Sequence, residues 1–304
     1  MHRLRGIALS LLLLGAGCAT THGDVASGID AVLQREHGKT IAVAYYDVDR
    51  GTAVLRNERE VFHAASTMKV PVMLGIFEAV SRGTLRLDQP VMVQNDFVSI
   101  YDGGHFALDK HEDSDPSLYD SIGTALPLEE LVRRMIDRSS NLATDLVIQL
   151  AGAPRIMELM RQIGANDIRV LRGVEDDKAY HAGMNNTVTA YDLMLIFRAL
   201  AEKRVVSTAA SGEMLDILLG QELNDGIPAG LPKGTRVAHK TGSITGIAHD
   251  AGIVIEPGGS RYILVVLTRG YAKERDAERV IARISRVIAA QRRYRSLRIS
   301  ARFF

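Results

Sequence analysis

The chain has 304 residues, of which 46% are hydrophobic, with 37 basic and 36 acidic side chains. This size and hydrophobicity allow a substantial core in one large domain or two entangled ones, which excludes a disordered or fibrous protein. The formal net charge of +1 supplies no global field for DNA or an acidic polymer, so we expect no nucleic-acid partner.

Residues 1–17 have the composition of a signal peptide, which predicts an exported protein. Basic residues precede a short apolar run at 7–14 that cannot span a bilayer. The single cysteine, Cys18, follows Leu-Gly-Ala-Gly, which is similar to a bacterial lipoprotein processing site. We therefore expect lipidation of Cys18, a tether over 18–23, and a periplasmic or membrane-anchored protein that meets the membrane only through its lipid. Ordinary signal cleavage or a buried inert thiol is the alternative.

The remaining residues, 24–304, predict strands near both ends of the chain and helices between them. In chain order, the apolar spacing predicts a helix from Val25 that ends by Gly38, strands at 40–46 and 52–55, and a buried helix at 68–80. It then predicts helices at 127–138, 142–151, 154–163, 190–203 and 212–219, strands at 235–241, 251–255 and 262–267, and a last helix at 273–288. One sheet should therefore take strands from both ends, with the helical block inserted and a cleft where the parts meet.

Residues 95–125 are polar and predict a long surface loop. The loop superficially resembles a metal site through five side chains: His105, Asp109, His111, Asp113 and Asp115. Their spacing follows no established zinc or calcium pattern, so we expect a solvated loop and no metal or cofactor.

The C-terminal end is basic and contains Arg292, Arg293, Arg295, Arg298 and Arg302. Such a run could touch an anionic membrane surface. A solvated, frayed terminus is the expectation we favour.

The first chemical motif is Ser66-Thr67-Met68-Lys69. On a helix, the hydroxyl of Ser66 and the amine of Lys69 lie on one face, one turn apart, so that the lysine can reach the serine. A buried lysine with a lowered pKa can activate a serine nucleophile, and a helix N-terminus stabilises a developing oxyanion. The alternative is an N-capping serine with a solvated lysine, but burying an idle lysine in this apolar helix would be costly.

Two further motifs carry polar groups suited to a substrate. Ser139-Ser140-Asn141 lies between two predicted helices, where a hydroxyl can relay a proton and an amide can bind a carbonyl. Its alternative role is an ordinary N-cap. Lys240-Thr241-Gly242-Ser243, on a predicted edge strand, offers a cation, two hydroxyls and a glycine that permits close approach, although such a sequence also ends many strands.

Together, in this order and separation, the three motifs resemble those of the class A β-lactamases and the penicillin-binding proteins. The resemblance implies an α/β (α+β) fold: an antiparallel five-stranded sheet flanked by helices from both chain ends, with a large inserted all-helical subdomain. It divides 24–304 into a sheet subdomain, 24–65 plus 235–290, and a helical subdomain, 66–234. It also implies a monomer that acts on a small-molecule substrate without a cofactor.

The resemblance assigns roles to the motif residues. Ser66 would be the nucleophile, Lys69 its activating partner, Ser139 the proton relay, and Asn141 a ligand of the substrate amide. The substrate carboxylate would be held by Lys240, Thr241 and Ser243. The backbone N–H groups of Ser66 and Ser243 would form the oxyanion hole.

The family deacylates with a glutamate on a loop, for which the candidate is Glu175. A solvated acidic turn at 175–177 is the alternative. The chain departs from the family pattern at two positions. Ser140 stands where the family usually has an aspartate, and the family's water-holding loop asparagine has no counterpart, Ala179 being the nearest residue by spacing. These departures predict that deacylation could be slow.

The expected function is a serine β-lactamase that uses an acyl-serine intermediate. The alternatives are a D-alanyl-D-alanine peptidase or esterase acting on cell-wall peptides, and a non-catalytic wall-binding lipoprotein. A Ser-His-Asp site built from His239, His249 and Asp250 is disfavoured because the chain has no Gly-x-Ser-x-Gly sequence.

Overall fold

The computed structural model describes residues 24–300, with side chains through residue 293. The predicted signal peptide and the predicted lipidation of Cys18 lie outside these residues. No helix within the described part of the chain is long and apolar enough to cross a membrane.

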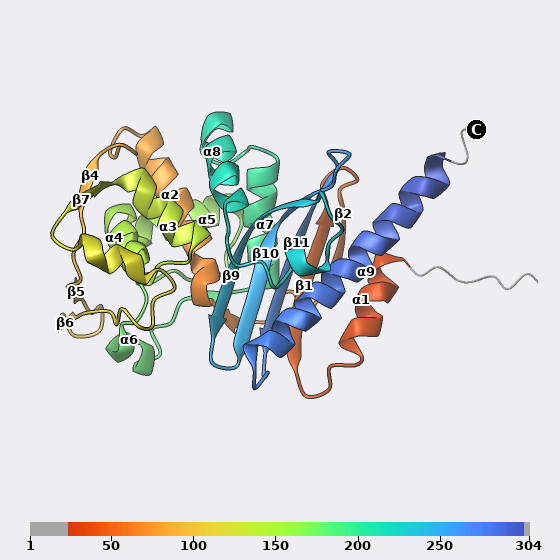
Figure 1. The fold of residues 1–304 in the computed structure, drawn as a ribbon, viewed down its shortest axis with the longest axis horizontal. Coiled ribbons are helices and arrows are strands. Elements are labelled where there is room, and N and C mark those ends of the chain that lie inside the picture. The colour runs from red at the N-terminus through yellow and green to blue at the C-terminus, as the bar shows by residue number, and fades with distance from the viewer. Residues whose placement is uncertain (1–23, 301–304) are drawn as a thin grey trace, which may run out of the picture.

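The centre of the fold is a five-stranded antiparallel sheet built from both ends of the chain (Figure 1). Its order is β2 (Thr52–Arg56), β1 (Thr40–Asp47), β11 (Arg261–Arg269), β10 (Ile247–Ile255) and β9 (Arg236–Ile244). The predicted fold class is therefore confirmed, and β9 lies at an edge of the sheet as expected.

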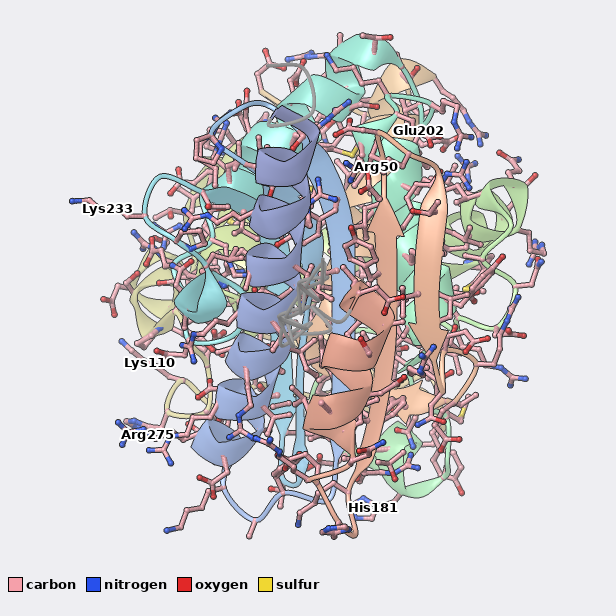
Figure 2. All side chains as sticks on the ribbon, turned by 90° about the vertical axis from the view of Figure 1, so that its right-hand side faces the viewer. Arg50, Lys110, His181, Glu202, Lys233 and Arg275 are labelled. Carbon is pink, nitrogen blue, oxygen red and sulfur yellow. The ribbon has the colours of Figure 1, made fainter. Side chains whose placement is uncertain are left out.

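The central strands are buried on both faces, because helices cover both. In β1, Ala42, Ala44 and Tyr46 belong to one hydrophobic cluster, while Ile41 and its alternate neighbours belong to another. This alternation is the two-residue period of a strand. One face carries α1 (Val25–Leu33) and α9 (Glu274–Ser300), which lie side by side in Figures 1 and 2. The other face packs against α7 (Ala190–Ala201).

The inserted part is organised around α2 (Lys69–Ser81), in which ten residues are buried. Around it pack α3 (Leu128–Asp137), α4 (Asn141–Ala151), α5 (Ala153–Ile163) and α8 (Thr208–Leu219). A 3-10 helix, η1 (Ala65–Met68), leads into α2 and also packs against β9. The helix that carries the first motif therefore connects the sheet to the helical core.

Short elements complete the inserted part. They are the antiparallel pairs β3 (Phe62–His63) with β8 (Thr187–Val188), β4 (Pro90–Met92) with β7 (Ala125–Pro127), and β5 (Phe97–Val98) with β6 (His105–Phe106). The remaining elements are η2 (Pro116–Ser121), α6 (Asp177–His181) and η3 (Pro228–Gly230).

The prediction of a solvated loop over 95–125 is wrong for much of that segment. It contains the β5–β6 hairpin and η2, and Asp113 and Asp115 are only 6% and 3% exposed. Polar side chains are buried here because they bind backbone N–H groups and arginines, which is how a folded chain satisfies buried acids.

The prediction of a frayed C-terminus is also wrong for the part described. Helix α9 continues to Ser300, and Arg292 is buried. Its guanidinium contacts Asp47 and donates to Glu256 Oε2 at 2.9 Å and to the Tyr45 hydroxyl at 2.8 Å. The helix continues because these bonds dock its second half on the sheet.

Candidate active site

Ser66 lies on η1, where the chain turns from the sheet into α2. Ala65, just before it, has a φ of 45°, a left-handed conformation that is uncommon for a residue with a side chain. The turn is tied by Thr67, whose N–H and hydroxyl both donate to the Ala64 carbonyl, at 3.1 and 2.6 Å. Ser66 itself is half-buried.

Lys69 is fully buried one turn after Ser66. Its Nζ donates to the Ser139 carbonyl at 2.7 Å, to Ser139 Oγ at 3.3 Å and to Asn141 Oδ1 at 2.8 Å. Burial lowers the pKa of Lys69 to about 8, against the opposing charges of Asp113, Asp145 and Glu175. An amine with this pKa is partly neutral near neutral pH and can accept a proton.

Lys240, on β9, is also fully buried and approaches Ser139 from the other side. Its Nζ donates to Ser139 Oγ at 2.9 Å and to the Thr241 carbonyl at 3.0 Å. Burial, together with the charge of Lys69, holds the pKa of Lys240 well below its ordinary value. The Ser139 hydroxyl thus accepts from both ammonium groups, which leaves its own proton available to another acceptor.

Asn141 joins this group to Glu175. Its Nδ2 donates to Glu175 Oε1 at 2.6 Å, so the amide bridges Lys69 and the carboxylate. Burial raises the pKa of Glu175, although the bond from Asn141 opposes this. Ser139 and Glu175 have φ of 61° and 57°. Strained backbone of this kind is concentrated at functional sites.

One pocket of about 300 Å³ brings the predicted segments together. Ser66, Asn141, Glu175 and Ser243 line it, and the buried Lys69 and Lys240 meet Ser139 beside it. Gly242 allows the close approach of β9, because a Cβ there would lie 2.9 Å from both Ser66 N and Thr67 N. The three motifs and the Glu175 loop therefore converge, although they are far apart in sequence.

One expected contact is missing among the described residues. The hydrogen bonds of Lys69 Nζ all go to the 139–141 turn, and none goes to Ser66 Oγ. The amine donates to three acceptors of that turn. For a proton transfer from Ser66, Lys69 Nζ would have to exchange one of these hydrogen bonds for a bond to Ser66 Oγ.

Sequence reasoning missed Asp145, which is fully buried on α4. Its Oδ1 accepts from Val174 N at 2.6 Å, and so holds the loop just before Glu175. Burial raises the pKa of Asp145 well above its ordinary value. Its spacing of four residues from Asn141, which puts both on one helix face, is the signal that could have found it.

His239 and Asp250 form a buried pair with a structural role. His239 Nδ1 lies 2.8 Å from Asp250 Oδ1, and Asp250 Oδ2 accepts from Ile227 N at 2.7 Å. His239 precedes Lys240 on β9, so its side chain points to the opposite face of the strand. His249 is bonded to the His63 carbonyl at 3.0 Å. Neither histidine lies within hydrogen-bonding distance of Ser66 Oγ in the described structure.

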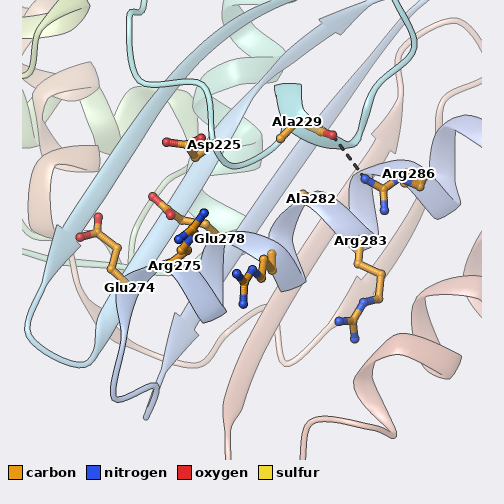
Figure 3. Close-up of a pocket in the computed structure, with 9 residues that line it drawn as sticks. Asp225, Ala229, Glu274, Arg275, Glu278, Ala282, Arg283 and Arg286 are labelled. Carbon is orange, nitrogen blue, oxygen red and sulfur yellow. Dashed lines mark hydrogen bonds between the residues drawn. The ribbon is translucent and has the colours of Figure 1, made fainter.

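Two other features of the structure bear on ligand binding. Among residues 24–300, no three His, Cys, Asp or Glu side chains are arranged to hold a metal ion. A larger hollow of about 850 Å³ lies against α9 and is lined by charged side chains such as Asp225, Glu278 and Arg286 (Figure 3). None of the predicted site residues lines it.

The fold is the one shared by class A beta-lactamases and penicillin-binding proteins. A solved beta-lactamase from Sphaerobacter thermophilus has 27% identity and a TM-score of 0.74, over 86% of this chain and 94% of that one. A variant of PBP-A, described as an acyl-enzyme complex with penicillin-G, has 23% identity and a TM-score of 0.74, over 89% and 96%.

The sequence places the chain within that class. The profile of the beta-lactamase enzyme family matches residues 24–291, and the chain belongs to this family. A curated relative, the extended-spectrum beta-lactamase PER-1 of Pseudomonas aeruginosa, is 25% identical over 268 residues, 81% of this chain and 80% of the relative.

Proposed function

We propose that the protein hydrolyses β-lactams through an acyl intermediate on Ser66. The observation that carries the proposal is the convergence of Ser66, Asn141, Glu175 and Ser243 on one pocket, beside two buried lysines that share the Ser139 hydroxyl. Family membership and the β-lactam named in the PBP-A complex support this substrate class.

In the acylation step, Ser66 Oγ attacks the lactam carbonyl and its proton passes to neutral Lys69. The lowered pKa of Lys69 favours this, and hydrogen bonds of catalytic groups often tighten only when substrate binds. The N–H groups of Ser66 and Ser243 would stabilise the oxyanion. Ser139 would then give its proton to the leaving nitrogen as the C–N bond breaks, while Lys240 holds the hydroxyl oxygen. Lys69 would pass the proton that it took from Ser66 on to Ser139, which restores both groups.

In the deacylation step, Glu175 takes a proton from a water that attacks the ester carbonyl, and returns that proton to the Ser66 oxygen as it leaves. The carboxylate lines the same pocket as Ser66 and is held by Asn141 at 2.6 Å. The raised pKa of Glu175 makes it a stronger base than an exposed glutamate.

A penicillin-binding protein that releases its acyl group slowly is the second candidate. The observation in its favour is Ala179, a buried methyl side chain on α6 that offers no hydrogen bond to a water. Such a protein would be acylated at Ser66 by the same first step.

We also propose export as a lipoprotein, with Cys18 as the anchor, on the sequence of residues 1–18.

Intact mass measured over time with a penicillin tests both steps. The wild type should gain one adduct and lose it as product forms, and Ser66→Ala should gain none. Glu175→Gln should be acylated and retain the adduct, because only its second step lacks a base. Ser81→Ala, an exposed serine at the end of α2, is the matched control and should behave as wild type.

The outcomes separate the candidates. A stable wild-type adduct without turnover would favour the slow-release protein over the hydrolase. The absence of any wild-type adduct would refute both and favour a non-catalytic wall-binding protein. Equal loss of both steps in Glu175→Gln would show that Glu175 has been assigned the wrong role.

A further inference from the structure

Asp113 places a buried carboxylate against the start of α4. Its two oxygens each accept from Asn141 N at 3.0 Å, and Oδ2 also accepts from Leu142 N at 2.8 Å. Ser140 Oγ lies 3.4 Å from the same Oδ2. Asp113 is 6% exposed and comes from a segment 28 residues earlier in the chain than Asn141.

These bonds complete the cap of α4. The first amides of a helix have no partner within the helix, and a negative charge there is favoured by the helix dipole. The side chain of Ser140, the N-cap residue, accepts from Ala143 N at 3.2 Å. Asp113 accepts from the two amides that Ser140 leaves free, those of Asn141 and Leu142.

The capped turn carries the groups that meet the lysines. Ser139, with its φ of 61°, presents both its carbonyl and its hydroxyl to Lys69, and Asn141 bridges Lys69 to Glu175. A strained residue keeps its conformation only when its surroundings hold it. The bonds from Asp113 to the residues directly after Ser139 supply such a constraint.

We propose that Asp113 is a positioning residue for the acylation step, because its carboxylate fixes the 139–141 turn against Lys69 and Glu175. The inference rests on the proposed function. It also gives residues 95–125 a role: the segment delivers to α4 the carboxylate that the family pattern has at the position of Ser140. The segment is anchored beside the site by Asp115, whose Oδ2 accepts from Arg134 at 2.8 Å on α3.

The charge of Asp113 has a second consequence. Lys69 is faced by the carboxyl groups of Asp113, Asp145 and Glu175 and by the ammonium group of Lys240. Asp113 raises the pKa of Lys69, so that removing its charge should lower this pKa further. The acid limb of acylation should then move to lower pH, which a loss of packing alone would not produce.

Four proteins test the proposal: Asp113→Asn, Ser140→Asp, the double variant, and Asp120→Asn. An asparagine offers one acceptor and turns N–H donors toward amides that are themselves donors, so Asp113→Asn should slow acylation roughly 10- to 100-fold. Ser140→Asp alone places two carboxylates at one helix start, and acylation of this variant should also be slow. In the double variant, Asp at the N-cap should recover most of the loss. Asp120→Asn, an exposed acid of the same segment paired with Lys110, should match the wild type.

The measurements are the rate of penicillin adduct formation across pH and the midpoint of thermal unfolding, both on the full chain. Adduct formation by the wild type tests the proposed function. The ratios of the acylation rates among the variants test the role of Asp113. The energetic coupling between positions 113 and 140 is also measured from the unfolding midpoints, a measurement that requires no enzymatic activity. Additive effects of the two substitutions, or an Asp113→Asn rate within twofold of wild type with an unmoved acid limb, would overturn the role of Asp113.

Discussion

At the scale of single residues, the distinctive feature is the burial of two lysines around one serine hydroxyl. Lys69 and Lys240 are both fully buried and both donate to Ser139 Oγ. Burying an ammonium group is costly unless its charge is neutralised or well bonded. The fold meets this cost with carbonyl and amide acceptors and with a lowered pKa at both amines. The same arrangement prepares one lysine to accept a proton.

The pKa of Lys69 predicts how acylation depends on pH. The neutral amine is the reactive form, so the acylation rate should rise with pH and level off above about 8. Below that value it should fall about tenfold for each pH unit as the amine becomes protonated. With a lysine of ordinary pKa, the acylation rate would keep rising to about pH 10. Rapid mixing with a chromogenic cephalosporin across pH provides the measurement.

Lys69→Arg is the control for this assignment, because a guanidinium stays charged at all accessible pH values. It should lose acylation throughout the range. A wild-type rate that does not change between about pH 6 and 9 would contradict the role of Lys69 as the base.

At the scale of elements, the site depends on how closely β9 approaches η1. Gly242 lies against this turn, and a Cβ at that position would also come within 3.2 Å of Ala65 Cβ. Atoms of backbone amides cannot move aside as the end of a flexible side chain can. The strand and the nucleophile turn would therefore have to separate if Gly242 had a side chain.

Gly242→Ala should therefore slow acylation by about 100-fold and destabilise the protein by about 1–3 kcal/mol. The first effect arises because Ser66 N and Ser243 N would no longer point to one oxyanion. Gly258→Ala is the matched control, because its Cβ would meet nothing within 4 Å. It should change stability by less than about 0.5 kcal/mol. Full activity of Gly242→Ala would show that the strand has room to shift without consequence.

At the scale of the whole molecule, the helical part is inserted between strands that belong to one sheet. The first and last segments of the chain must therefore come together to form the sheet. Helix α9 stabilises this arrangement through Arg292, whose partners lie on β1 and just after β10. None of these residues lines the pocket of Ser66, so we expect that the network can be weakened without changing the chemistry.

Arg292→Ala should destabilise the protein by about 3–5 kcal/mol, because it leaves the buried Asp47 carboxylate without its main counterion. Denaturant unfolding measures this change. Arg293→Ala, at the exposed neighbouring residue, should cost less than about 0.5 kcal/mol. The folded fraction of Arg292→Ala should acylate at the wild-type rate, and a slowed rate would show that the network reaches the site.

Local sequence pattern was sufficient for most of the framework. Alternating and continuous apolar runs located all five strands of the sheet, and helical periodicity located the helices around α2. The Ser66 to Lys69 spacing of one helical turn already placed these residues near each other, and an apolar helix already implied a buried amine. The strands, the helices and the spacing of Ser66 and Lys69 are set by residues close together in the sequence, so the local sequence pattern is enough to predict them.

The tertiary structure alone decided which polar groups meet. Asp113 and Asp115 were expected in solvent, Arg292 in a frayed tail, and Asp145 was not noticed at all. A polar side chain looks the same in sequence whether it faces water or satisfies a buried amide. Its role is set by groups brought beside it from distant segments, as Lys240 is brought to Ser139 across 101 residues. Hydrogen bonding of this kind is a property of packed elements, and no local period encodes it.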